Sequence, residues 1–301
     1  MWFSSLGAIA PSDFKGMNMK KKNSKKFIYR VLFVIFLSMF LIASGLMAYD
    51  WYKEYKAQKQ FEDLSNLTQD DTNKENDESG ESESVEDEKT DFEALGIEIP
   101  EKYLDWEAIQ GENPHIYAWL CIPGTDIDYP IIQHPDDARY YLRRDIYGQD
   151  STAGCIFTEF YNEKDFTDLN TVIYGHNMRN GTMFASLHNY ENLGFFEEYP
   201  YVYIYLPTGV LVYEVFAAYE GGDQHLLFSY DSTTPATFQS YLDAVFSIRD
   251  MGAHFRDGLE VTGEDHIISL STCVRGEATS RYLVQAVLIN EESLSEEVMS
   301  D

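Results

Sequence analysis

A single uninterrupted apolar segment near the N-terminus constrains the fold of this chain more than any other feature. Residues 27–49 read FIYRVLFVIFLSMFLIASGLMAY, with one charge, Arg30, near the start. A helix of about 20 residues spans the hydrocarbon core of a bilayer, and an arginine one turn from its end can extend to the interface. The segment is apolar on every face, which argues against a core helix. We therefore expect a transmembrane anchor at 27–49.

Basic residues on the N-terminal side of this segment set its expected orientation. They are Lys20, Lys21, Lys22, Lys25 and Lys26. By the positive-inside rule, residues 1–26 are cytoplasmic and the chain after the anchor is extracellular. A cleaved signal peptide is the alternative, because small residues at 43–45 offer cleavage sites, but the apolar run is longer than the ~7–15 residues usual for such peptides. The sequence predicts a single-pass protein of the cell membrane.

The stretch after the anchor has a different composition. Residues 52–67 have an amphipathic, helix-like pattern, and residues 68–90 hold ten acidic side chains and only two lysines. Low hydrophobicity and like charge prevent collapse, so we predict an acidic disordered linker at 50–91 and a folded domain at 92–301. The net charge of −29 argues against a nucleic-acid partner.

The folded domain is a series of short apolar runs separated by turn signals. A helix is expected at 103–110, and a second at 234–251, where Pro235 suits the first turn and apolar residues recur with helical spacing. Regularly spaced strands predict a mainly β domain, a barrel or a sandwich. The expected strands are 118–122, 129–133, 152–157, 171–174, 201–206, 211–219, 267–271 and 282–289.

The chain has three cysteines, and an odd number outside the cell leaves at least one free thiol. Cys121 and Cys155 lie in apolar runs typical of core strands. They are buried as small hydrophobic residues or joined as a disulfide, since sequence does not give their separation. No cysteine or histidine has the ligand spacing of a zinc site, so no metal is expected.

Three apolar runs each deliver one reactive group. Cys273 ends the run IISLSTC at 267–273, His176 follows TVIYG at 171–175, and Arg281 opens the run at 281–289. They could supply a thiolate nucleophile, a proton carrier and a partner for an oxyanion. Taken singly, each has an ordinary structural role: a core cysteine, a turn histidine and a solvated arginine at a strand end.

Together with their neighbours, these residues resemble the signature of sortases, the cysteine transpeptidases of Gram-positive cell surfaces. LSTC at 270–273, YGHNM at 174–178 and Arg281 carry this resemblance. The chain resembles class B sortases in particular. This further resemblance is carried by the position of the helix at 234–251 and by segments 113–120, 122–125, 127–130, 153–157 and 181–184. The resemblance covers roughly residues 105–289 and implies a closed β-barrel with an N-terminal helix and an extra helix before the cysteine strand.

The resemblance also implies a mechanism without metal or organic cofactor. Cys273 would be the nucleophile, His176 the acid/base and Arg281 the oxyanion partner. The enzyme would cleave a C-terminal sorting motif of secreted proteins through a thioester and transfer the product to an amine of peptidoglycan or of a pilin subunit. The residues expected to line the substrate groove are Ser271, Thr272, Leu142, Leu227 and Phe228.

The chain departs from the family pattern at two places. Ser269 stands where the TLxTC pattern begins with threonine, and Val274 and Arg275 follow the cysteine where an acidic residue is common. Arg275 is thus a rival to Arg281, which we favour because it opens a β-run. Two other functions remain open: a cysteine hydrolase of the same motif, and a non-catalytic adhesion module in which Cys273 would be a core residue.

Overall fold

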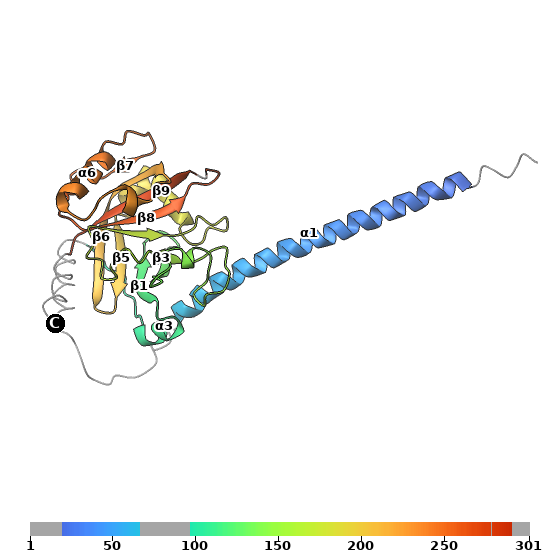
Figure 1. Ribbon diagram of the computed structural model, residues 1–301, viewed down its shortest axis with the longest axis horizontal. Coiled ribbons are helices and arrows are strands. Elements are labelled where there is room, and N and C mark those ends of the chain that lie inside the picture. The colour runs from blue at the N-terminus through green and yellow to red at the C-terminus, as the bar shows by residue number, and fades with distance from the viewer. Residues whose placement is uncertain (1–19, 67–96, 278, 291–301) are drawn as a thin grey trace, which may run out of the picture. The chain divides into compact units, whose positions relative to one another are not determined.

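The computed structural model describes residues 20–66, 97–277 and 279–290 (Figure 1). It divides the chain into two compact units, Met1–Lys53 and Glu54–Asp301. The predicted cytoplasmic segment up to residue 19 lies outside the described residues. So do the acidic part of the predicted linker and the predicted domain start at residue 92.

The predicted anchor lies within one long helix, α1 (Lys20–Asn66). Among the described residues, Lys25–Ser65 is the one helical stretch long and apolar enough to cross a membrane, and the side chains of its apolar run are exposed. Length and composition are therefore compatible with the predicted anchor.

The last turns of α1 belong to the second unit. Ala57, Phe61 and Leu64 are buried in the main core cluster, and their spacing places them on one face of the helix. The ring edge of Phe61 meets Tyr129, with ring centroids 5.3 Å apart. The amphipathic helix predicted at 52–67 is therefore present, and it packs on the folded domain although the predicted linker begins at residue 50.

The second unit is built on one continuous sheet. In the described part of the chain it has nine strands, in the order β5-β1-β2-β3-β4-β8-β9-β6-β7, and β5 also pairs with β6. That last pairing closes the strands from β5 to β6 into a barrel, and β7 extends the sheet beyond β6. The strands are β1 (Ile116–Cys121), β2 (Asp128–Ile132), β3 (Ile156–Thr158), β4 (Asn170–Tyr174), β5 (Tyr201–Leu206), β6 (Gly209–Gly222), β7 (His254–Phe255), β8 (Ile267–Cys273) and β9 (Ser280–Leu288).

Short helices connect the strands. The longest of them, α6 (Pro235–Phe246), starts with Pro235 in its first turn, and the side chain of Thr234 accepts a hydrogen bond from the Thr237 N–H. This is the helix expected before the cysteine strand, with Pro235 in its first turn as expected, and Thr234 is its cap. The others are α3 (Trp106–Glu112), η1 (Tyr140–Leu142), η2 (Ala185–Glu191), α4 (Leu193–Glu198) and α5 (Leu226–Ser229).

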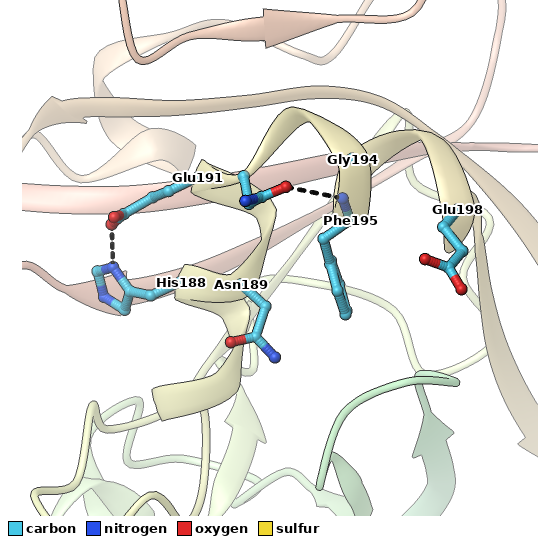
Figure 2. Close-up of a pocket in the computed structure, with 7 residues that line it drawn as sticks. His188, Asn189, Glu191, Gly194, Phe195 and Glu198 are labelled. Atoms are coloured by element: carbon cyan, nitrogen blue, oxygen red, sulfur yellow. Dashed lines mark hydrogen bonds and ion pairs between the residues drawn. The ribbon is translucent and has the colours of Figure 1, made fainter.

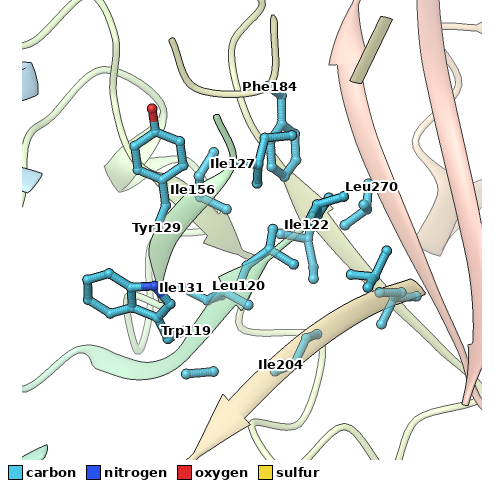
Figure 3. Packing of buried hydrophobic residues seen from close by; sticks show 14 of the residues in the cluster. Trp119, Leu120, Ile122, Ile127, Tyr129, Ile131, Ile156, Phe184, Ile204 and Leu270 are labelled. Carbon is cyan, nitrogen blue, oxygen red and sulfur yellow. The ribbon is translucent and has the colours of Figure 1, made fainter. Parts of the chain in front are cut away.

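Alternation along the strands produces two hydrophobic clusters. On β9, Val284 and Ala286 belong to the main cluster inside the barrel, whereas Leu283 and Val287 belong to a second cluster that includes α6. Successive side chains of a strand point to opposite faces, so β9 is buried on both sides. Figure 3 shows the main cluster, where Leu120, Ile131 and Leu270 come from three different strands. The predicted mainly β closed barrel is confirmed.

Candidate active site

Strands β4 and β8 bring the two predicted motifs to one edge of the barrel. They run parallel, with Tyr174 opposite Ser271. Beyond that pair, the Gly175 N–H donates to the Ser271 carbonyl at 3.2 Å, and the Thr272 hydroxyl donates to the Gly175 carbonyl at 2.8 Å. Because parallel strands keep their register, the next residues in line are His176 and Cys273. The backbone positions of the predicted histidine and cysteine therefore lie at the same edge of the barrel.

Strand β9 adds the arginine from the other side of β8. In this antiparallel pair Cys273 lies directly opposite Arg281. Side chains of directly opposite residues share a face, with Cβ atoms about 4.5–5.5 Å apart. Cys273 is exposed, Arg281 is half-buried, and the Arg281 guanidinium also donates to the Ser280 carbonyl at 2.9 Å. The rival Arg275 lies in the exposed β8–β9 loop, outside this strand pairing.

His176 is oriented by a main-chain contact. Its Nε2 lies 2.8 Å from the carbonyl oxygen of Leu142 in η1. A carbonyl can only accept, so Nε2 carries the proton in this contact, and the acid/base role predicted for His176 would fall to Nδ1. The predicted groove residue Leu142 thus contributes its backbone to the site.

The glycine before His176 is required by close packing. A Cβ on Gly175 would lie 2.6 Å from Ile156 Cδ1 and 2.6 Å from Phe184 Cγ. Phe184 also anchors the loop after β4, because its N–H donates to the His176 carbonyl at 2.9 Å. The sequence Tyr-Gly-His therefore lets β4 pass against the core and still present the imidazole at its end.

The other two thiols have a different environment from Cys273. All three cysteines are free. Burial raises the pKa of Cys121 to about 11, and burial raises the pKa of Cys155 well above its usual value. Cys155 lies 3.3 Å from the Arg144 carbonyl, to which its thiol donates. Since the thiolate is the reactive form, burial disfavours Cys121 and Cys155 as nucleophiles, and the exposed Cys273 stays the predicted one.

A model of the sortase domain matches residues 120–289, more than half of the chain. The chain belongs to the sortase family. At the level of the family, the comparison confirms the predicted class of enzyme, a cysteine transpeptidase, and the matched range contains the cysteine, the histidine and the arginine described above.

Its relatives are class B sortases. The chain is 36% identical to sortase B of Listeria monocytogenes over 167 residues, which cover 55% of this chain and 65% of that protein. It is 28% identical to sortase B of Staphylococcus aureus, over 61% of this chain and 74% of that protein. Among solved structures, sortase B of Bacillus anthracis matches with a TM-score of 0.61 and 26% identity, covering 79% of this chain and 99% of that one.

The departure of this sortase at Ser269 has a structural explanation. The Ser269 hydroxyl is fully buried, donates to Asn170 Oδ1 at 2.9 Å and accepts from Gln285 Nε2 at 2.7 Å. These bonds join β4, β8 and β9 below the reactive edge. The serine is therefore a satisfied member of a buried polar network.

The predicted groove residues of this sortase are distributed unevenly. Phe228 is 65% exposed and Leu227 is half-buried, both on α5. Ser271 and Thr272 are buried, with only 2% of Thr272 exposed. Thr272 therefore offers almost no surface to a substrate, and its hydroxyl joins β8 to the turn after β4. The substrate-lining role of all five residues remains a prediction.

Helix α5 is attached to the barrel by a buried ion pair that sequence analysis missed. His225 Nε2 lies 2.8 Å from Glu159 Oε2, and the Glu159 side chain is only 5% exposed. Burial raises the pKa of this carboxyl, and His225 opposes that shift. The His225 ring lies 4.3 Å from the ring of Phe228, measured between centroids. The pair thus fixes the segment that carries the exposed aromatic side chain.

Sequence analysis also missed His188. This half-buried residue of η2 contacts the carbonyl of Cys273 and lines a shallow hollow with Glu191, Phe195 and Glu198 (Figure 2). It lies 85 residues from Cys273 and belongs to no motif. No group of His, Cys, Asp and Glu side chains within the described ranges is arranged to hold a metal ion.

Proposed function

We propose that this sortase is a membrane-anchored cysteine transpeptidase, with Cys273 as nucleophile, His176 as acid/base and Arg281 as oxyanion partner. The observation that supports this most strongly is the strand pairing at the barrel edge. Cys273 lies opposite Arg281 across β8 and β9, and β4 ends beside it to deliver His176. Main-chain pairing that brings the backbone positions of three chemically complementary residues to one edge supports this proposal.

In the acylation step, the Cys273 thiolate attacks the backbone carbonyl carbon of the scissile bond in a sorting motif. A C–S bond forms, and the carbonyl oxygen becomes an oxyanion that the Arg281 guanidinium stabilises. The C–N bond then breaks. The leaving amine takes a proton from His176, and a thioester remains on Cys273.

In the transfer step, an amine attacks the thioester carbonyl. The new C–N bond forms as the C–S bond breaks, and the amine loses its proton to His176. The products are an amide and the Cys273 thiolate beside a protonated His176, the state from which acylation began, so the two steps balance without an oxidant, a reductant or a metal. We propose secreted proteins with an NPxTN-like or LPxTG-like C-terminal motif as donors, and a peptidoglycan or pilin amine as acceptor.

We further propose that α1 anchors this activity at the cell membrane. Its lysine-rich start favours a cytoplasmic N-terminus, which leaves the barrel outside the cell with its substrates. The predicted cell-wall and secreted partners are found on that side of the membrane.

The test is cleavage of a library of quenched sorting peptides by the full chain in detergent, with and without an added amine. Transpeptidation predicts that one peptide class is cleaved and that mass spectrometry finds the amide product when amine is present. If water remains the sole acceptor at millimolar amine, the hydrolase alternative replaces the transpeptidase.

The adhesion-module alternative requires Cys273 to be buried, whereas this thiol is exposed. Labelling with a methanethiosulfonate reagent at neutral pH separates the two functions. Catalysis predicts one rapid label, at Cys273, with Cys121 and Cys155 modified after unfolding. An unlabelled native chain would favour the adhesion module.

A further inference from the structure

Two side chains hold the backbone carbonyl of Cys273. Asn177 Nδ2 donates to this oxygen at 3.0 Å, and His188 Nε2 lies 3.2 Å from it. Asn177 and His188 also contact each other, with Nδ2 and Nε2 2.9 Å apart. Asn177 is the residue next to His176, so this cluster links the histidine end of β4 to the cysteine end of β8.

His188 is itself held on two further sides. Its Nδ1 contacts Glu191 Oε1, one turn later on η2 (Figure 2). Its ring stacks on Tyr282, with centroids 4.9 Å apart and an interplanar angle of 24°. Tyr282 is the neighbour of Arg281 on β9. The imidazole therefore touches segments that carry all three reactive residues.

The carbonyl of Cys273 accepts a hydrogen bond whether the His188 ring is neutral or doubly protonated. The carboxylate of Glu191 and the carbonyl of Cys273 are both acceptors. A doubly protonated ring donates to both of them, and Asn177 Nδ2, itself a donor 2.9 Å from Nε2, then forms no hydrogen bond with the ring. A neutral ring protonated at Nδ1 donates to Glu191 and accepts an N–H of Asn177, whose second N–H donates to the Cys273 carbonyl. Glu191 thus fixes the ring orientation in both cases.

The carbonyl of Cys273 needs such support because the strand ends there. Beyond it, the Val274 N–H reaches the Ser280 carbonyl only at 3.4 Å, and the loop continues through exposed residues. Rotation of the peptide after Cys273 would turn the thiol away from His176. A misplacement of 1 Å in an active site can reduce a rate about a hundredfold.

We propose that His188, supported by Glu191, is a positioning residue for the nucleophile. It fixes the last peptide of β8 so that the Cys273 thiol faces His176. This inference rests on the proposed role of Cys273 as nucleophile. The competing explanation is purely structural, namely that the His188 ring only packs on Tyr282.

Two substitutions separate the hydrogen bond from the packing. His188→Phe keeps a ring to stack on Tyr282 but has no nitrogen to hydrogen-bond to Asn177 or to the Cys273 carbonyl. His188→Gln keeps a side chain that can donate and accept, without the ring. Glu191→Gln removes the carboxylate behind the imidazole. Glu198→Gln is the matched control, because Glu198 lines the same hollow. The measurements are kcat and KM for the cleaved sorting peptide, and the melting temperature, with the full chain in detergent.

We expect His188→Phe and Glu191→Gln to lower kcat about tenfold or more, with KM changed less than about twofold. His188→Gln should retain more activity than His188→Phe at a similar melting temperature, and Glu198→Gln should match the unmodified protein. If His188→Phe is as active as the unmodified protein, or more active than His188→Gln, the positioning role is wrong and the ring only packs.

A spectroscopic measurement keeps this test independent of turnover. Selective ¹³C labelling of cysteine carbonyls gives three resonances, and Cys273→Ala identifies the one from residue 273. Loss of the hydrogen bonds of the His188 ring in His188→Phe should shift the Cys273 carbonyl resonance, whereas Glu198→Gln should leave it unchanged. An unmoved resonance would overturn the inference. If Cys273→Ala still cleaves the peptide at the unmodified rate, it is the proposed function that fails.

Discussion

The reactive edge of the barrel and helix α5 are held by different kinds of contact; α5 is called the wall below, because its residues Leu227 and Phe228 are predicted to line the substrate groove. At the edge, the strands of Cys273, His176 and Arg281 are placed by main-chain pairing between β4, β8 and β9. At the wall, α5 is attached by a side-chain ion pair between His225 and Glu159. Main-chain register fixes positions tightly, whereas a single side-chain pair can change without loss of the fold. We therefore expect mutations at the edge to affect chemistry and mutations at the wall to affect substrate binding.

The largest effect is expected at the arginine. Arg281→Ala should lower kcat for transpeptidation about 10²–10³-fold, because it removes the charged donor proposed to stabilise the oxyanion. Arg275→Ala, in the exposed loop, should leave kcat within about threefold. Steady-state kinetics with one sorting peptide and a fixed amine measure both variants. The reverse result would reassign the oxyanion role to Arg275. It would also show that the pairing of β8 with β9 does not determine which arginine acts in catalysis.

An intermediate effect is expected at Gly175. Gly175→Ala places a methyl group 2.6 Å from Ile156 and Phe184, and overpacking of this kind costs about 1–3 kcal/mol of stability. Because His176 follows directly, kcat should fall as well. Gly209→Ala is the control, since a Cβ there meets no atom within 4 Å. In thermal unfolding, Gly175→Ala should have a clearly lower melting temperature than Gly209→Ala. Equal melting temperatures would show that the side chains around residue 175 move to accept the methyl group without loss of stability.

The smallest effect is expected at the wall. Glu159→Gln or His225→Ala should raise KM about three- to tenfold, equivalent to about 0.7–1.4 kcal/mol, and leave kcat within about twofold. The reason is that these changes release α5 and Phe228 without touching the reactive groups. Asp223→Asn, in the same loop but exposed, is the matched control. A fall in kcat at unchanged KM would mean that α5 takes part in the chemistry.

This contrast also explains what could be predicted from the sequence. The strands carrying the reactive residues were found because their apolar runs are short and bounded, and antiparallel pairing of 267–273 with 281–289 follows from the short loop between them. The observed β8 and β9 match these runs within one residue at their starts. The helix at 234–251 was found from its apolar spacing and from Pro235 in its first turn, although α6 ends earlier, at Phe246.

The contacts that were missed join residues distant in sequence. His188 meets Cys273 across 85 positions, and this contact depends on how the barrel closes. The ion pair between His225 and Glu159 depends on the conformation of the loop after β6, which no periodic pattern encodes. The two-residue strand β7 (His254–Phe255) is too short to produce an alternating pattern. Local pattern thus predicted the three candidate catalytic residues, whereas the contacts that support their segments become visible only in the tertiary structure.

The central claim is that Cys273 forms a covalent acyl intermediate. The most direct measurement is the intact mass of the full chain, quenched in acid during turnover of a cleaved sorting peptide without amine, followed by proteolysis to locate the adduct. We predict an added mass equal to the N-terminal peptide fragment, located on Cys273 and absent from Cys273→Ala. An adduct on another residue, or continued cleavage by Cys273→Ala, would contradict the account.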